Sequence, residues 1–250
     1  MEKISVAIIT KDEELNIRQC LESVKWADEI VVVDSGSTDR TLEICREYNV
    51  SAYVEEWKGF SRQKNSAIQK TRNEWVLSLD ADERVTPTLV REISRLMETG
   101  PRREGYFMAR KNFFLGRWMR RCGWYPDFNL RLFRKSRGGF LERSVHECVK
   151  VQGEVGYLEN ALEHHTYRSL TDFLKRMDRY SRLGAEEMRK EGRRFRMADL
   201  LRPPFTFFQM YFLRLGFLEG YRGFLLSRLY SFYTFAKYAK LREIEENEKS

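Results

Sequence analysis

The chain has 250 residues, of which 42% are hydrophobic and 33% charged, and its formal net charge is +8. This size favours one substantial core with an appendage. Its four cysteines have no closely paired spacing and its three histidines accompany no Cys-x-x-Cys pattern, which argues against a disulfide scaffold and a zinc site. Cys20 and Cys45 are expected to be small core residues in a reducing compartment. Met1 leads directly into an apolar run, so no signal peptide is expected.

Strand-like and helix-like segments alternate through the first hundred residues. Apolar runs rich in β-branched residues lie at 5–10, 30–33, 51–54 and 75–79. Helical spacing of apolar residues, or a helix-start signal, occurs at 17–24, 41–48, 61–70 and 87–99. Continuous apolar strands are typical of a parallel sheet covered on both faces. The pattern predicts an α/β doubly wound half-domain, whose ligands bind beyond the carboxyl ends of the strands.

Two aspartates, Asp80 and Asp82, follow the apolar run 75–79 one residue apart. Carboxylates at the end of a strand suit a divalent cation that also holds phosphate oxygens. Thr10 and Asp34 end two other runs and are expected at the same sheet edge. The alternative is a solvated turn after the strand, and Glu83 is interpreted as inert or as tuning Asp82.

The remainder of the chain is basic and then aromatic. Residues 101–143 carry 12 Lys or Arg and three Asp or Glu, which predicts an anionic partner unless the charges only solubilise the chain. A charged amphipathic helix is predicted at 167–190, followed by a break at Pro203-Pro204. Residues 205–238 are crowded with aromatics and interrupted by arginines, and no uncharged window reaches the roughly 18 residues of a spanning helix. Helices of this kind fit a membrane surface, or pack on the catalytic domain or another subunit.

The segments 5–14 (SVAIITKDEE), 31–41 (VVVDSGSTDRT) and 80–83 (DADE) resemble the inverting family 2 glycosyltransferases of GT-A fold. Segments 123–127, 130–134, 144–147 and 203–205 resemble the bacterial lipopolysaccharide-core β-glucosyltransferases within that family. The resemblance implies a GT-A catalytic domain at 1–165, with a nucleotide-binding half at 1–100 and an acceptor-binding half at 101–165. An aromatic-rich helical region would follow at 166–250.

The resemblance implies transfer of a hexose from a UDP-sugar to a saccharide or lipid-linked acceptor such as the lipopolysaccharide inner core, and glucose is the first candidate for the hexose. It assigns the nucleotide-sugar site to Thr10, Lys11, Glu13, Asp34, Ser35, Lys64, Asn65, Asp80, Ala81, Asp82, Arg131 and Arg134. Asp34 would accept a hydrogen bond from uracil, or would only form a turn. Arg131 and Arg134 would clamp a phosphate. Mg²⁺ or Mn²⁺ would bind Asp82 and Asp80, with His146 as a further ligand.

An inverting transfer also needs a carboxylate base on the acceptor side, for which Glu147 is the first candidate and Asp127 the second. Trp124 and Tyr125 form a candidate sugar-stacking pair. The expected location is cytoplasmic, on the inner surface of the membrane. A homo-oligomer is possible, and no nucleic acid is expected as partner.

Two other functions agree less well with the sequence. A metal-dependent nucleotidyltransferase would need a glycine-rich loop after the first strand, and residues 11–16 contain no glycine. A non-catalytic membrane-binding or nucleic-acid-binding protein would leave Asp34, Asp80 and Asp82 unexplained.

Overall fold

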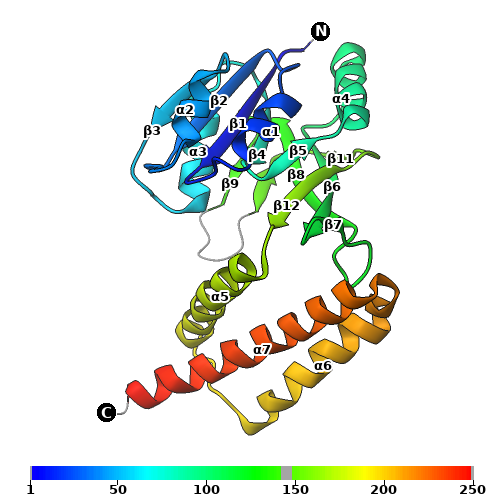
Figure 1. The fold of residues 1–250 in the computed structure, drawn as a ribbon. Coiled ribbons are helices and arrows are strands. Elements are labelled where there is room, and N and C mark those ends of the chain that lie inside the picture. Colours follow the sequence, from blue (N-terminus) through cyan, green and yellow to red (C-terminus); the bar gives the residue numbers. More distant parts are fainter. Residues whose placement is uncertain (1, 142–147, 249–250) are drawn as a thin grey trace. The chain divides into compact units, whose positions relative to one another are not determined.

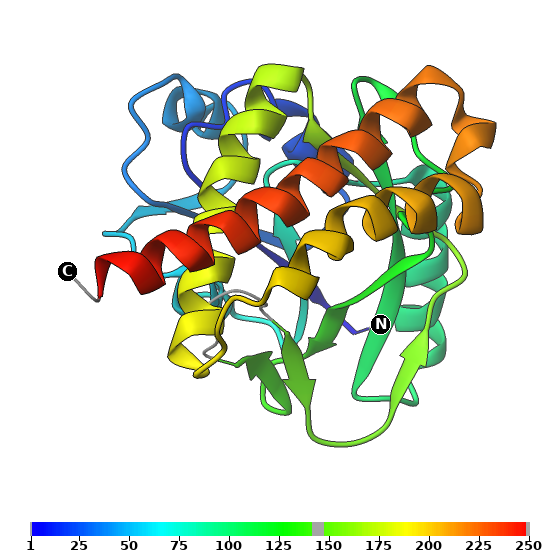
Figure 2. The same ribbon diagram turned by 90° about the horizontal axis from the view of Figure 1, so that it is seen from below.

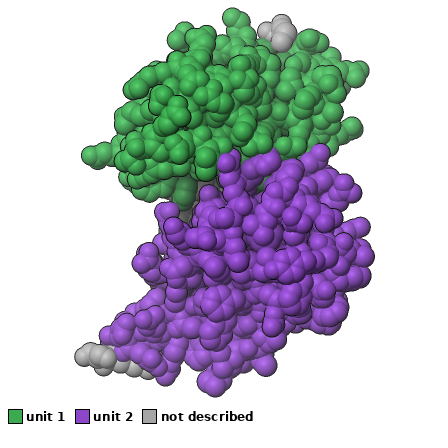
Figure 3. Space-filling model, in the orientation of Figure 1, with its two compact units in different colours: residues 1–110, 127–164 green, residues 111–126, 165–250 purple. Residues whose placement is uncertain are grey.

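The structure, a computed structural model, describes residues 2–141 and 148–248 (Figures 1 and 2). The chain divides into two compact units (Figure 3). Unit 1 comprises Met1–Arg110 and Asp127–His164, and unit 2 comprises Lys111–Pro126 and His165–Ser250. The predicted boundary after residue 165 assigned residues 111–126 to the first domain. The structure instead groups this segment with the C-terminal helices.

Unit 1 is built on a mixed sheet, with strand order β3-β2-β1-β4-β8-β6-β12-β5 in the described part of the chain (Figure 1). The parallel members are β1 (Ile4–Thr10), β2 (Glu29–Asp34), β3 (Ser51–Val54) and β4 (Trp75–Asp80). Antiparallel pairing then joins β4 to β8 (Asp127–Arg134), β8 to β6 (Gly105–Phe114), and β12 (Leu162–Tyr167) to β5 (Glu83–Val85). The smaller strands are β7 (Arg117–Trp118), β9 (Gly138–Phe140), β10 (Val149–Val151) and β11 (Val155–Tyr157).

Helices cover both faces of the parallel strands. Val6 and Ile8 of β1 pack in one core, which also contains residues of α1 (Ile17–Ser23), α2 (Thr41–Arg46) and α4 (Pro87–Thr99). Ala7 and Ile9 pack in a second core with α3 (Phe60–Gln69). Successive strand residues point to opposite faces, so every position of β1 is buried. This two-sided burial explains the continuous apolar runs, and it confirms the predicted α/β fold class.

The parallel strands end together, as predicted. Thr10 lies beside Asp34 across β1 and β2, and Ile9 lies beside Asp80 across β1 and β4. This register places Thr10, Asp34 and Asp80 at one edge of the sheet. The chain turns there through Ala81 and Asp82 before β5.

Unit 2 consists mainly of three helices, α5 (Leu170–Lys190), α6 (Arg202–Phe208) and α7 (Tyr221–Asn247). Short helical turns, η1 (Met197–Leu201), η2 (Gln209–Leu213) and η3 (Gly216–Glu219), connect them. Helices α6 and α7 lie side by side (Figures 1 and 2). Pro203 and Pro204 stand at the start of α6, where proline is tolerated, so the predicted break is a helix start.

The core of unit 2 explains why residues 111–126 belong to it. Phe114, Met119 and Cys122 pack in one cluster with Phe173 of α5 and Leu226 of α7. These apolar side chains therefore tie the segment to the helices. Within the described residues, no helix has the length and apolar character required to cross a membrane.

Candidate active site

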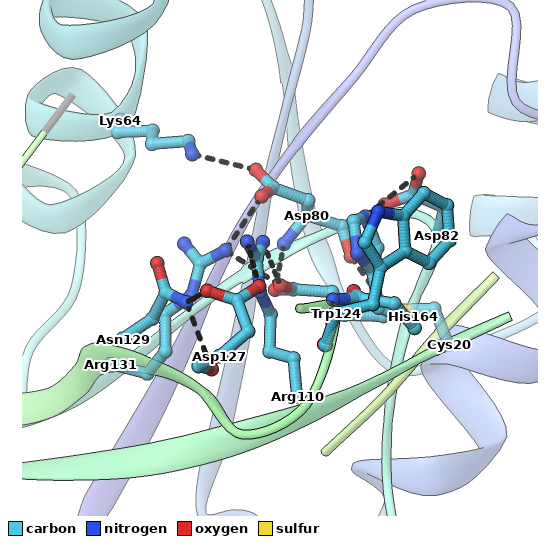
Figure 4. Close-up of polar contacts among 12 residues, drawn as sticks. Cys20, Lys64, Asp80, Asp82, Arg110, Trp124, Asp127, Asn129, Arg131 and His164 are labelled. Carbon is cyan, nitrogen blue, oxygen red and sulfur yellow. Dashed lines mark hydrogen bonds and ion pairs between the residues drawn. The ribbon is translucent and has the colours of Figure 1, made fainter. Parts of the chain in front are cut away.

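Asp80 ends β4 between two buried cations (Figure 4). Its Oδ1 lies 2.8 Å from Nζ of Lys64, which comes from α3. Its Oδ2 accepts a 2.8 Å hydrogen bond from Nη2 of Arg131, which comes from β8. Both carboxylate oxygens are thus bonded to positive charge, and helix, strand and sheet edge are joined at one point.

Glu83 lies beneath this pair and is fully buried. Its Oε1 accepts hydrogen bonds from Nη2 of Arg131 at 2.6 Å and from Nη1 of Arg110 at 3.3 Å. Its Oε2 accepts the backbone N–H of Asp80 at 3.0 Å. The interpretation of Glu83 as inert is therefore wrong, because this carboxylate holds the end of β4 and two arginines.

Asp127 extends the network toward β6. Its Oδ2 accepts from Nε and Nη2 of Arg110 at 2.9 and 2.7 Å, and its Oδ1 accepts from Nδ2 of Asn129 at 3.0 Å. Three cations thus alternate with three carboxylates in the order Lys64, Asp80, Arg131, Glu83, Arg110 and Asp127 (Figure 4). Such pairing offsets the high cost of burying charge.

The charges fix the protonation state of the network. Burial alone would raise the pKa of the Asp80 carboxyl, but the positive charges of Lys64 and Arg131 outweigh it and hold that pKa well below its usual range. Burial would lower the pKa of Arg131, but the carboxylates of Glu83 and Asp80 raise it by more, so the net shift of that pKa is upward. Asp80 is therefore an anion, and Arg131 a cation, at neutral pH.

Asp82 lies past the strand end and is oriented differently. Its side chain is buried, and its Oδ2 lies 3.4 Å from Nε2 of His164 on β12. The sheet brings these residues together, because His164 is the register partner of Glu83, the neighbour of Asp82. Among the residues described, no three His, Cys, Asp or Glu side chains gather as a metal cage. His146 and Glu147, the predicted further ligand and base, lie outside the described residues.

The edge beyond β1 and β2 carries unused hydrogen-bonding capacity. The hydroxyls of Thr10 and Ser35 are buried and have no hydrogen-bond partner within the described part of the chain. The two residues are adjacent, since the Ser35 N–H donates to the Thr10 carbonyl at 2.9 Å. Other buried polar atoms of the described residues also lack a partner, but Thr10 and Ser35 lie together at the edge where ligands of such sheets bind.

Asp34 shows the turn geometry that was the alternative to uracil binding. Its Oδ1 accepts the N–H groups of Gly36 and Ser37 at 2.9 and 2.8 Å, and the Ser37 hydroxyl also donates to its carboxylate. An ionised carboxylate has about four acceptor sites, so these bonds leave capacity for a further donor. Contact with a base stays a prediction for Asp34.

Three predicted site residues have other partners. The amide of Asn65 bonds at both ends to the backbone of Phe140, with 2.9 Å in each direction. Arg134 pairs with Trp75 at the opposite end of β4 from Asp80, and residues three apart on a strand face opposite ways, so Arg134 does not join Arg131 at the site. Trp124 packs in the core of unit 2 and is no open sugar platform.

The other predicted residues lie close to these elements. Ala81 is buried beside Asp80, whereas Lys11 is exposed. Glu13 accepts a 2.6 Å hydrogen bond from Asn16 and so belongs to the turn before α1. The Tyr125 ring meets Trp118 edge-on, with centroids 5.2 Å apart. The sequence pointed to Asp80, Asp82, Lys64, Arg131 and Asp127. It left Glu83 open between an inert residue and one that tunes Asp82, and it did not single out Arg110 or His164.

Comparisons with known proteins bear on this site. A family model described as Glycosyl transferase family 2 matches residues 5–164. The chain is 31% identical to the "Lipopolysaccharide core biosynthesis glycosyltransferase LpsC" of Rhizobium meliloti, over 94% of this chain and 91% of that protein. It is also 31% identical to an "Uncharacterized glycosyltransferase" of Rickettsia felis, over 97% and 90% of the two chains. The crystal structure of S. aureus TarS 1-349 in complex with UDP-GlcNAc has a TM-score of 0.50 at 16% identity, covering 99% and 91%.

Proposed function

The chain belongs to glycosyl transferase family 2 and has the GT-A fold. We propose that this glycosyltransferase moves a hexose from a UDP-sugar to a saccharide such as the lipopolysaccharide inner core, with glucose as the first candidate for the hexose. The observation that carries the donor part is the pair of buried, unpartnered hydroxyls of Thr10 and Ser35 at the carboxyl edge of the sheet. Ligands of such sheets bind at that edge. The acceptor part rests on the likeness to LpsC, which extends over nearly all of both chains.

A divalent cation fits Asp82 better than it fits Asp80. Both oxygens of Asp80 are bonded to Lys64 and Arg131, whereas Asp82 lies next to an imidazole, His164. One carboxylate and one imidazole would leave several coordination positions for diphosphate and water oxygens, as Mg²⁺ and Mn²⁺ sites require. When bound, the ion would supply positive charge to the diphosphate as the nucleotide leaves.

Arg131 and Glu83 then act as positioning residues. Arg131 is buried and its Nη2 donates to both Asp80 and Glu83, so this nitrogen is already used to hold the two carboxylates in place. The Glu83 bond to the Asp80 N–H holds the backbone immediately before Asp82. A side chain must be held within about half an ångström for efficient catalysis, and this network provides that restraint for Asp82.

The base that accepts the proton of the acceptor hydroxyl is proposed to be Glu147, with Asp127 second. Arg110 and Asn129 both bond to the Asp127 carboxylate, so it would have to leave these partners to accept a proton. Replacing the base should lower kcat by about two to four orders of magnitude, with little change in donor KM. We therefore expect Glu147→Gln to show this loss and Asp127→Asn a smaller one.

A donor and acceptor panel tests the function. Purified protein is incubated with UDP-glucose, UDP-galactose or UDP-GlcNAc, each with a deacylated inner-core oligosaccharide, and products are read by mass spectrometry and NMR. We expect a single added glucose with β configuration and its loss in Asp82→Ala. Glu98→Ala, which changes an exposed acid on α4, is the matched control. Transfer from none of these donors, or undiminished transfer by Asp82→Ala, would contradict the proposal.

A further inference from the structure

The helices of unit 2 carry a surface that the transfer reaction does not use. We propose that this surface, formed by the exposed apolar side chains of residues 205–235, binds the headgroup layer of an anionic lipid bilayer. Along α6 and η2 the exposed rings are Phe205, Phe208 and Phe212, and along α7 they are Phe224, Phe232 and Phe235. Each set recurs at helical spacing and makes a stripe. Each of the six rings is between 42% and 59% exposed, which is unusual for phenylalanine.

Ring contacts through Phe207 join the two stripes near the end of α6 and the start of α7. The Phe207 ring lies 6.4 Å from the Phe212 ring and 5.8 Å from the Phe224 ring, measured between centroids. The guanidinium of Arg228 lies 5.2 Å from the Phe207 centroid and so adds a cation to the surface. Large continuous apolar patches on a protein mark an interaction site.

The charges of this segment select an anionic partner. Residues 200–242 contain seven Lys or Arg and a single acidic residue, Glu219. Glu219 is buried, and its Oε1 accepts the backbone N–H groups of Arg120 and Arg121 at 2.9 and 3.1 Å. Three of these cations, Arg202, Lys240 and Arg242, form ion pairs with acids outside the segment. Within the described part of the chain the other four, Arg214, Arg222, Arg228 and Lys237, form no ion pair, so they remain to face an anionic partner. Basic, aromatic surfaces of this kind bind anionic headgroups.

The tip between α6 and α7 is suited to a water-poor layer, because several of its backbone N–H groups are internally bonded. The N–H groups of Arg214, Leu215 and Leu218 donate to the carbonyls of Gln209, Phe212 and Leu215, at 2.8, 3.1 and 3.1 Å. Unsatisfied backbone groups are what exclude irregular segments from lipid. Leu213 and Leu218 are 61% and 56% exposed at this tip, so they present apolar contacts.

A second copy of the chain is a poorer occupant than lipid. In a two-fold dimer the same patch meets itself, so two surfaces of equal positive charge would be brought together. Like charges across an interface are costly. An anionic bilayer instead offers the opposite charge together with an apolar layer.

Vesicle flotation of the full-length protein tests the proposal. The probes are phosphatidylcholine vesicles with and without 30% phosphatidylglycerol, at low and high salt. We expect binding to the anionic vesicles that weakens with salt, and about tenfold weaker binding for the double variant Leu213→Ser/Leu218→Ser. A second variant, Phe232→Ser/Phe235→Ser, should behave alike, whereas Leu15→Ser changes an exposed leucine of unit 1 and should bind normally.

Circular dichroism first establishes that each variant is folded. Absence of binding by the wild-type protein, or binding that neither double variant reduces, would overturn the proposal. A concentration-dependent dimer that both double variants dissociate, with no vesicle binding, would assign the surface to a second copy and would also overturn it. Since no step of the assay measures sugar transfer, its result is independent of the proposed function.

Discussion

Arg131 illustrates, at the scale of single residues, how strongly the network depends on each member. The side chain is 4% exposed and neutralises both Asp80 and the fully buried Glu83. We expect Arg131→Met to destabilise the fold by about 3–5 kcal/mol, because it removes from the network the one cation that contacts both Asp80 and the buried Glu83. Arg134→Met, three positions along the same strand, should cost about 1 kcal/mol, since Arg134 pairs with partly exposed acids.

Urea unfolding followed by circular dichroism measures both free energies of unfolding. Equal losses for the two variants would show that the buried network contributes no more than an ordinary surface ion pair. A second outcome against the account would be an Arg131→Met protein that is as stable as wild type.

Asp80 gives the network a defined dependence on pH. Its pKa is lowered in the folded protein, so its ionised form stabilises the fold above the unfolded value of about 4, and this contribution is lost as the pH falls further. We expect Asp80→Asn to cost about 2 kcal/mol at pH 7 and the difference from wild type to shrink below pH 4. Urea titrations at several pH values would detect this; a difference that stays constant down to pH 3 would contradict it.

The residues of the site were only partly predictable. Asp80 and Asp82 follow an apolar run within three positions, so the run that predicts the strand also predicts their place at its end. Arg110 and His164 become partners of Glu83 and Asp82 only through strand pairings that join distant segments. No local pattern marks such residues. Trp124 was predicted to stack on a sugar beside Tyr125, but its ring is packed in the core of unit 2.

At the scale of elements, two helical glycines make a matched pair. A Cβ on Gly223, near the start of α7, would overlap the backbone carbonyl oxygen of Gly216. A Cβ on Gly184, within α5, would lie 3.0 Å from the flexible side chain of Lys237 and 3.8 Å from the Tyr233 hydroxyl, an ordinary van der Waals distance. We expect Gly223→Ala to lower the Tm, and Gly184→Ala to be neutral or to stabilise by up to about 1 kcal/mol, because alanine favours helix.

Thermal unfolding of the two variants separates these effects. A Gly223→Ala protein with an unchanged Tm would show that η3 and the start of α7 can separate without loss. The close approach of Gly216 and Gly223 would then not be required for the tip that carries the aromatic surface.

The strands and helices of the first hundred residues were predictable because both faces of the parallel sheet are covered. Because both faces of such a strand are buried, successive residues are apolar, as at 75–79. The three-residue strand β5 has no such run, and it exists because β12 pairs with it. Pro203-Pro204 was read as a break, yet the same residues begin α6.

At the scale of the whole molecule, the proposed donor site and the proposed lipid-binding surface belong to different units. Unit 1 holds the acid–cation network at the sheet edge, and unit 2 holds the aromatic surface. Segment 111–126 was predicted to belong to the acceptor half, because it continues directly from β6 in the sequence. Its apolar side chains pack in unit 2, a long-range effect that periodicity does not encode.

The central claim is that Asp82 serves a metal-dependent UDP site at this edge. Isothermal titration of UDP into the wild-type protein, Asp82→Ala and the control Glu98→Ala, each with and without Mn²⁺, tests it most directly. We expect micromolar binding that requires the metal, persists in Glu98→Ala and disappears in Asp82→Ala. Binding of equal strength in Asp82→Ala, or no binding of UDP by the wild-type protein with the metal present, would contradict it.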